Sequence, residues 1–277
     1  MSLYQEITDQ IVEMIEAGTP PWRQPWTGSS SASMPIRSNG EPYQGINVLM
    51  LWMWASKRGF NCPQWITFKQ AKAMGGAVRK GEKGVKVVYF NVVEKDDQKI
   101  PFLKSYTVFN MEQCDGIDYQ NPEPPIDLGT EPDARLDAFF HGTGANIISG
   151  QNFRAYYHPS QDLIHMPPIK AFESTESYYA VLAHELVHWT GAGKRLDRIK
   201  KFQDRQEYAF EELVAEIGSC MLCADLGLIP DLDQSSAYVE SWLKALKNDC
   251  RLIFKAAAES QKAVNYIHST HQKEVAA

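Results

Sequence analysis

The sequence predicts an α+β protein of two domains, and three observations lead to this prediction. The chain has 277 residues, which exceeds the usual size of a single domain. In its first half, segments with the apolar period of helices stand beside a stretch with the β-branched and aromatic content of a hairpin. A proline-rich, acidic stretch at residues 114–130 separates this half from a second one, in which short strand-like segments precede long helices. We therefore place the domains at residues 1–125 and 126–277.

The elements of the first half follow from capping and apolar spacing. Ser2 and Gln5 form a capping box, and apolar residues recur at helical intervals until Gly18, which predicts a first amphipathic helix. Residues 45–59 are apolar on nearly all sides and predict a buried helix. The other elements expected here are a short basic helix opened by Thr67 and Gln70, and a hairpin of residues 85–93 and 102–110.

The second half is predicted to contain a small sheet followed by long helices. The expected elements are a helix at residues 133–141, strands at 145–149, 153–158 and 162–166, and helices at 174–189, 207–226, 236–247 and 249–266. We interpret residues 162–166 as an edge strand. Such a strand either pairs with an extended peptide or is an ordinary edge of the sheet.

Composition indicates an ordinary globular protein, with 44% hydrophobic and 22% charged residues. The chain starts without the basic and apolar run of a secretory signal, and no stretch approaches about 18 uninterrupted apolar residues. We therefore expect a cytoplasmic protein without a membrane partner. The five cysteines are scattered along the chain, which favours reduced thiols over a disulfide framework.

A His-Glu-x-x-His pattern at residues 184–188 predicts a metal site. His184 and His188 are four residues apart, so both imidazoles fall on one face of a helix and reach a single cation. Glu185 adjoins the first histidine, where its carboxylate is able to take a proton from a water activated by the metal. Uncharged flanking residues predict a buried helix, in which these polar groups need a compensating ion.

The third metal ligand is predicted on the next helix. We choose Glu212, with Glu211 as the alternative one residue off the same face. Glu216 follows Glu212 by one turn, an arrangement in which one carboxylate binds the metal and the other hydrogen-bonds a ligating histidine. Zinc is the expected ion, with manganese or another divalent cation as the alternative. The residues interpreted as ordinary core or surface positions are His158, His165, Cys220 and Cys223.

The first half of the chain combines aromatic with basic residues. Five of the seven tryptophans fall within the first 65 residues, and residues 57–86 hold eight basic residues and one acid, in a chain of net charge −6. Unpaired bases stack on aromatic rings while Lys and Arg contact phosphates, so this combination predicts a single-stranded DNA interface. An ordinary basic surface is the alternative. The candidate residues are Trp22, Arg23, Trp26, Arg37, Tyr43, Trp65, Lys69, Lys72, Arg79, Lys80 and Lys83.

Several segments together resemble one family. Residues 21–26, 43–47, 65–71 and 75–84 are similar to the N-terminal domain of ArdC-type antirestriction proteins, a domain that also occurs in plasmid-encoded primases. The likeness continues through residues 162–167, 184–191 and 211–216, so it spans nearly the full chain.

The resemblance implies a single-stranded DNA-binding domain joined to a zincin-like metallopeptidase domain, carried by mobile elements and protecting incoming DNA from host restriction. Carried over residue by residue, it implies a metal site at His184, His188 and Glu212, with Glu185 as the catalytic carboxylate. Thr190 departs from the family pattern, because many zincins have an apolar residue at this position.

The leading hypothesis is therefore a DNA-entry protein whose first domain coats single-stranded DNA and whose second domain holds a hydrolase-competent metal site. Two alternatives stay open. One is a DNA-binding protein that occludes restriction enzymes, with a structural metal. The other is a regulatory peptidase that cleaves a repressor or a subunit of a host restriction enzyme, with DNA binding serving recruitment.

Overall fold

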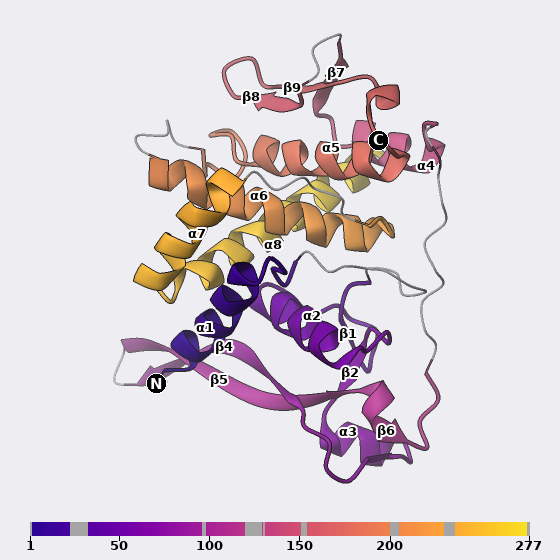
Figure 1. Ribbon diagram of the computed structural model, residues 1–277, viewed down its shortest axis with the longest axis vertical. Coiled ribbons are helices and arrows are strands. Elements are labelled where there is room, and N and C mark those ends of the chain that lie inside the picture. Colours follow the sequence, from indigo (N-terminus) through magenta and orange to yellow (C-terminus); the bar gives the residue numbers. More distant parts are fainter. Residues whose placement is uncertain are drawn as a thin grey trace. The chain divides into compact units, whose positions relative to one another are not determined.

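The computed structural model confirms a mixed α+β chain with two compact units (Figure 1). It describes residues 2–22, 33–95, 98–119, 129, 131–150, 154–199, 205–229 and 236–275. One unit comprises Met1–Ala32 with Pro124–Ala277, and the other comprises Ser33–Glu123. The units differ from the predicted domains in where the first residues of the chain belong. None of the described helices is both long and apolar enough to cross a membrane.

The unit Ser33–Glu123 is built on a four-stranded sheet of order β1-β2-β5-β4. Strands β4 and β5 form the predicted hairpin, paired from Val85 with Val108 to Lys95 with Gln98. A second pair of short strands, β3 and β6, lies beside α3. The elements are β1 Ile36–Arg37, α2 Ile46–Arg58, β2 Gln64–Ile66, α3 Phe68–Ala73, β3 Ala77–Val78, β4 Val85–Lys95, β5 Gln98–Asn110, the 3-10 turn Met111–Gln113 and β6 Cys114–Asp115.

Helix α2 is the buried apolar helix that the sequence predicts, and Asn47 ties it to the edge strand β4. The Asn47 amide donates to the carbonyl oxygen of Val88 and accepts from the Val88 N–H, both at 2.8 Å. These two bonds satisfy the backbone groups that an edge strand leaves open. Asn47 therefore fixes the position of α2 along the sheet.

The other unit stacks long helices beside a three-stranded sheet. Its elements are α1 Leu3–Glu16, α4 Ala134–His141, β7 Asn146–Ser149, β8 Tyr156–His158, β9 Leu163–Met166, the 3-10 turn Ile169–Ala171, α5 Thr175–Thr190, α6 Arg205–Leu226, α7 Ser236–Asn248 and α8 Leu252–Val275. The sheet order is β7-β9-β8, so β9 has a neighbour on each side. The interpretation of residues 162–166 as an edge strand was therefore wrong, and β8 is the edge strand that faces the site described below.

Helix α1 packs with the C-terminal helices, which explains why the compact units depart from the predicted domains. Its apolar stripe, including Ile7 and Ile11, is buried. The Thr8 hydroxyl donates to the carbonyl oxygen of Cys250 at 2.7 Å, and the Tyr4 ring lies 4.7 Å from that of Phe254. An amphipathic stripe specifies that a helix must be covered, but not which part of the chain covers it.

Candidate functional site

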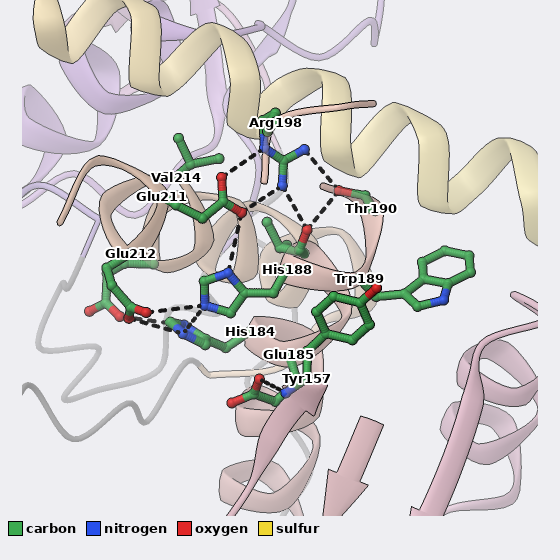
Figure 2. A network of polar contacts seen from close by, with 12 residues as sticks. Tyr157, His184, Glu185, His188, Trp189, Thr190, Arg198, Glu211, Glu212 and Val214 are labelled. Carbon is green, nitrogen blue, oxygen red and sulfur yellow. Dashed lines mark hydrogen bonds and ion pairs between the residues drawn. The ribbon is translucent and has the colours of Figure 1, made fainter. Parts of the chain in front are cut away.

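Helices α5 and α6 bring together the three predicted metal ligands (Figure 2). The Nε2 atoms of His184 and His188 are 3.1 Å apart. The Glu212 carboxylate lies 3.7 Å from Nε2 of His184 through Oε2, and 3.5 Å from Nε2 of His188 through Oε1. All three donor atoms fall within 4.8 Å of one another, and this is the one such group of His, Cys, Asp and Glu among the described residues.

These separations fit a divalent cation. Ligand atoms bound at about 2.0–2.1 Å in a tetrahedral arrangement stand roughly 3.3 Å apart. The separations of 3.1, 3.5 and 3.7 Å scatter around that value, and the two that involve Glu212 run to different oxygens of its carboxylate. Two imidazoles and one carboxylate are also a donor set that zinc accepts with an open coordination position. Both the spacing of the donor atoms and their chemical types therefore fit a divalent cation such as zinc.

His188 is held from behind by a buried ion pair. Its Nδ1 lies 3.2 Å from Oε1 of Glu211, so Nδ1–H donates and Nε2 is left to face the metal position. Arg198 donates to both carboxylate oxygens of Glu211, at 2.9 and 3.0 Å. The Arg198 and Glu211 side chains are only 6% and 3% exposed. Glu211, which the sequence offered as the alternative metal ligand, therefore contacts Nδ1 of His188, the ring nitrogen that faces away from the metal position.

The same network explains why residue 190 is a threonine, although many zincins have an apolar residue at this position. Its hydroxyl donates to the carbonyl oxygen of Val187 at 2.6 Å and accepts from Arg198 at 3.0 Å. Gly191 allows the following loop to fold back, because a Cβ there would stand 2.7 Å from the Ile199 side chain and 3.1 Å from the Arg198 guanidinium. A hydroxyl in place of an apolar side chain therefore helps to hold Arg198.

The carboxylates also set the charge of the site. Burial by itself lowers the pKa of His188, but hydrogen bonds and charges from Glu211 and Glu212 outweigh it and raise that pKa from 6.5 to about 10. Burial raises the pKa of Glu212, yet the two imidazoles outweigh it and bring that pKa well below its usual range. Without an ion, His188 therefore favours the imidazolium form, with protons on both ring nitrogens. Metal binding has to release the proton on Nε2.

Glu216 lies near the outer nitrogen of the other histidine. Nδ1 of His184 is buried without a hydrogen-bond partner among the described residues, and Oε2 of Glu216 is 3.9 Å away. That separation is within the range of an ion pair and longer than a hydrogen bond. A role for Glu216 as the hydrogen-bond partner of a ligating histidine stays a prediction.

Glu185 lines the same cavity, of about 290 Å³, and is fastened to strand β8. Its Oε2 accepts from the backbone N–H of Tyr157 at 2.7 Å (Figure 2). Two tyrosines, Tyr208 and Tyr238, also line the cavity, and their hydroxyls are 3.2 Å apart. A larger cavity of about 510 Å³ lies among α6, α7 and α8, and its described lining residues include no such set of metal donors.

The β8–β9 turn is braced against the end of α5. The Tyr157 hydroxyl donates to Asp162 at 2.8 Å, and Arg195 donates to the same hydroxyl at 3.0 Å and to Asp162. The Arg195 guanidinium also lies 4.1 Å from the centre of the Trp189 ring. Hydrogen bonding from Arg195 lowers the pKa of Asp162 well below its usual range. These contacts among Tyr157, Asp162 and Arg195, called the brace below, therefore hold the Tyr157 N–H in position to donate to Glu185.

We expect Asp162→Asn to lower the free energy of unfolding at pH 7 by about 1–3 kcal/mol, since Arg195 is buried and loses a charged partner. Asn tolerates the backbone φ of 51° at this position, so the turn is retained. The folded-state pKa of Asp162 is depressed, so its contribution is present above the unfolded pKa of about 3.9 and is lost as the pH falls below it.

Urea unfolding between pH 3 and pH 7 measures this difference between wild type and variant. The matched control is Asp115→Asn, because Asp115 is 74% exposed and pairs with Arg79 at 3.6 Å. An exposed pair of this kind contributes below about 1 kcal/mol. Equal effects of the two substitutions at pH 7 would contradict the brace.

The sequence carries no signal for the roles of Arg198, Arg195 or the Tyr157 N–H. Both arginines stand in a basic loop that resembles a solvated surface segment, and a backbone N–H leaves no mark in a sequence. Glu211 was visible as a carboxylate beside Glu212, but its contact with His188 depends on how α6 packs on α5.

The candidate stacking residues of the first half are mostly buried. Trp22, Tyr43 and Trp65 are 1%, 2% and 2% exposed. Trp22 packs against Trp242, with ring centres 6.3 Å apart, and Arg37 covers the Tyr43 ring at 5.1 Å. The structure leaves these three rings no face on which a base could stack. Arg23 and Trp26 lie outside the described residues.

The candidate basic residues fall into two groups. Arg79 donates to Glu82 at 3.0 Å and to the carbonyl oxygen of Glu112 at 2.7 Å, so it holds the turn that follows β3. Arg37 is half-buried and pairs with Glu41 at 3.2 Å. The remaining candidates are exposed and form no described ion pair: Lys69, Lys72, Lys80 and Lys83.

Comparisons with known families match two segments of the chain. Residues 134–259 match the family of zincin-like metallopeptidases, and residues 1–109 match the N-terminal domain of anti-restriction factor ArdC. Fold and site therefore define the class as a zincin-like domain joined to an ArdC-type N-terminal domain.

Relatives span the full length of the chain. It is 56% identical to the antirestriction ArdC protein from the R388 plasmid in a metal-free crystal structure, with a TM-score of 0.90 and 99% of each chain covered. It is 57% identical to the Mn(II)-bound crystal structure of that protein, with a TM-score of 0.87 and 98% of each chain covered. This chain belongs to the ArdC family of antirestriction proteins.

Two curated relatives extend the comparison. The uncharacterized protein y4eC of Sinorhizobium fredii is 37% identical over 96% of this chain and 92% of its own length. A DNA primase TraC of Escherichia coli is 36% identical over 98% of this chain. The chain spans only 27% of the length of that primase.

Proposed function

We propose that this protein binds single-stranded DNA through the unit Ser33–Glu123 and protects incoming DNA from restriction, and that its metal site is a peptidase centre. One observation carries the proposal of a peptidase. Two imidazole nitrogens and a carboxylate converge within 4.8 Å, in a cavity that Glu185 also lines. Surplus lysines on the DNA-binding unit, together with membership in the ArdC family, support the DNA part.

In this proposal His184, His188 and Glu212 hold a divalent ion, with zinc or manganese as the candidates. The ion, when bound, supplies a Lewis acid that lowers the pKa of water and polarises a carbonyl. Glu185 acts as the general base through Oε1, for which the structure describes no hydrogen bond, and before substrate binds Oε2 accepts from the Tyr157 N–H. Glu211 and Arg198 keep the His188 ring in the orientation and tautomer that presents Nε2.

An extended peptide is the substrate class that fits this site. Strand β8 is an edge strand on the cavity, so a peptide backbone is able to pair with it. Pro159 has no N–H, and the Tyr157 N–H is bound by Glu185. A peptide carbonyl that takes the Tyr157 N–H would free the Glu185 carboxylate, so binding of substrate and readiness of the base would be coupled.

The two alternatives differ in what Glu185 contributes. In a protein that occludes restriction enzymes, the metal only joins α5 to α6, and the Glu185 carboxylate is dispensable. In a regulatory peptidase that cleaves a repressor or a subunit of a restriction enzyme, Glu185 is needed, and a specific partner protein is shortened. The Arg198–Glu211–His188 network, which links the two helices, is compatible with a structural metal as well.

The test is conjugative transfer of unmodified DNA into a restricting recipient, with and without the protein. We expect Glu185→Gln to lower protection toward the level without protein, because the amide does not accept the proton of water. Bound metal should not change, since Glu185 is not a ligand. Glu173→Gln, an exposed acid before α5, is the matched control.

Full protection by Glu185→Gln would exclude proteolysis as the mechanism and favour occlusion. Loss of protection together with a shortened restriction subunit or repressor, seen by mass spectrometry in the wild-type arm only, would favour the regulatory peptidase.

A further inference from the structure

Phe68 is the most exposed large apolar side chain among the described residues, at 59%. It is the first residue of α3, whose start is fixed by a capping box between Thr67 and Gln70. A single exposed apolar residue is ordinary on a protein surface. Exposure by itself therefore does not indicate a binding role for Phe68, and the neighbouring residues decide whether it has one.

The lysines of α3 form no described ion pair. Lys69 and Lys72 are exposed, and neither forms an ion pair with a described residue. The one acid between residues 57 and 86, Glu82, is occupied by Arg58 at 3.3 Å and Arg79 at 3.0 Å. The arginines of this stretch therefore stabilise the fold, while its lysines keep their charge for a ligand.

The orientation of α3 follows from its contacts. Ala71 is fully buried in a cluster with Ile66 of β2, so α3 covers the face of the sheet on which Ile66 lies. Gln70 donates to the Ser38 hydroxyl at 3.0 Å, which turns that flank of α3 toward β1. At 100° per residue, Phe68 and Lys72 fall on the opposite flank, and Lys69 points outward.

Strand register places a further lysine on the same face. Ile66 pairs with Phe109, and Thr107, two residues earlier on β5, pairs with Lys86 of β4. Residues paired directly across strands, and those two apart on one strand, share a face. Lys86 and Thr107 are both exposed. Because the sheet order is β1-β2-β5-β4, they lie on the side toward which Phe68 and Lys72 are turned.

We propose that single-stranded DNA binds across this α3 surface, defined by Phe68, Lys69, Lys72 and Lys86, with a base stacked on the Phe68 ring and phosphates on the lysines. An aromatic ring exposed among mobile cations suits an unpaired base, since every base offers a stacking face that a duplex keeps closed. The inference rests on the proposed function and assigns stacking to Phe68 in place of the buried Trp22, Tyr43 and Trp65.

The test is fluorescence anisotropy of a labelled oligothymidine of about 20 nucleotides with the full-length protein. We expect Phe68→Ala to weaken binding by about 5- to 100-fold and Phe68→Trp to restore it. The matched control is Tyr89→Ala, because Tyr89 is also an exposed aromatic residue, at 40%. It shares a face of the sheet with Val87, and this face is opposite to the one that carries Lys86. That variant is expected to bind as the wild type does.

The charges are tested separately. Replacing Lys72 and Lys86 by alanine should reduce the slope of log affinity against log salt by about 0.7 for each phosphate that a lysine no longer neutralises. Binding by Phe68→Ala within twofold of wild type would overturn the α3 surface, as would a loss confined to Tyr89→Ala. Failure of the wild type to prefer the single strand over a duplex of equal length would instead overturn the proposed function, and this surface with it.

Discussion

Replacement of His184 by alanine is expected to reduce the bound metal from about one ion per chain to less than about a tenth of that, at the same free metal concentration. The variant keeps His188 and Glu212 but loses one of the three donors that lie within 4.8 Å. Elemental analysis after gel filtration in zinc, and separately in manganese, measures the change. His141→Ala, an exposed histidine on α4, is the control.

The same variant gives a second readout in stability. A ligand that binds only the folded state stabilises it by about 2.7 kcal/mol at one hundred times its dissociation constant. A chelator should therefore lower the melting temperature of the wild type and leave that of His184→Ala unchanged. If the variant retained a full equivalent of metal, the ion would have to bind elsewhere, and the peptidase proposal would fail with it.

Replacement of Arg198 by methionine is expected to lower the free energy of unfolding by about 3–5 kcal/mol, because it leaves the Glu211 carboxylate buried without its arginine partner. The pair is bidentate, and its side chains are 6% and 3% exposed. Metal affinity should fall by about 10- to 100-fold as well, since Glu211 no longer fixes the His188 ring. Urea unfolding and metal titration measure the two effects.

A double variant separates the effect of the buried charge from that of altered packing. Adding Glu211→Gln to Arg198→Met removes the uncompensated charge, so the double variant should be more stable than Arg198→Met alone. Arg198→Lys keeps a charge but not the two-pronged geometry, and we expect an intermediate result. Additive destabilisation in the double variant would show that Arg198 and Glu211 do not act as a pair.

The sequence indicated the candidate metal ligands because residue type and local periodicity mark part of the set. Four-residue spacing puts His184 and His188 on one face of any α-helix, and the same spacing relates Glu212 to Glu216. The α+β class, the helices and the hairpin were confirmed, since apolar period, capping and turn residues act over a few positions.

The partners of these residues were decided by packing between distant segments. Arg198 and Glu211 are thirteen positions apart and meet only because a loop folds back over Gly191. Strand β9 has a neighbour on each side because β7 comes to lie parallel to it, a pairing that no periodicity encodes. The apolar face of helix α1 packs against helices that follow it by more than two hundred residues.

The unit Ser33–Glu123 shows the same limit for aromatic residues. Residue type alone does not tell whether an aromatic ring is buried, as that of Trp65 is, or exposed, as that of Phe68 is. Residue types and their spacing specify the chemical groups on offer, which are two imidazoles, several carboxylates, aromatic rings and surplus lysines. Which of these groups face one another and which face water depends on the folded chain, because burial is set by contacts between segments that the chain order does not specify.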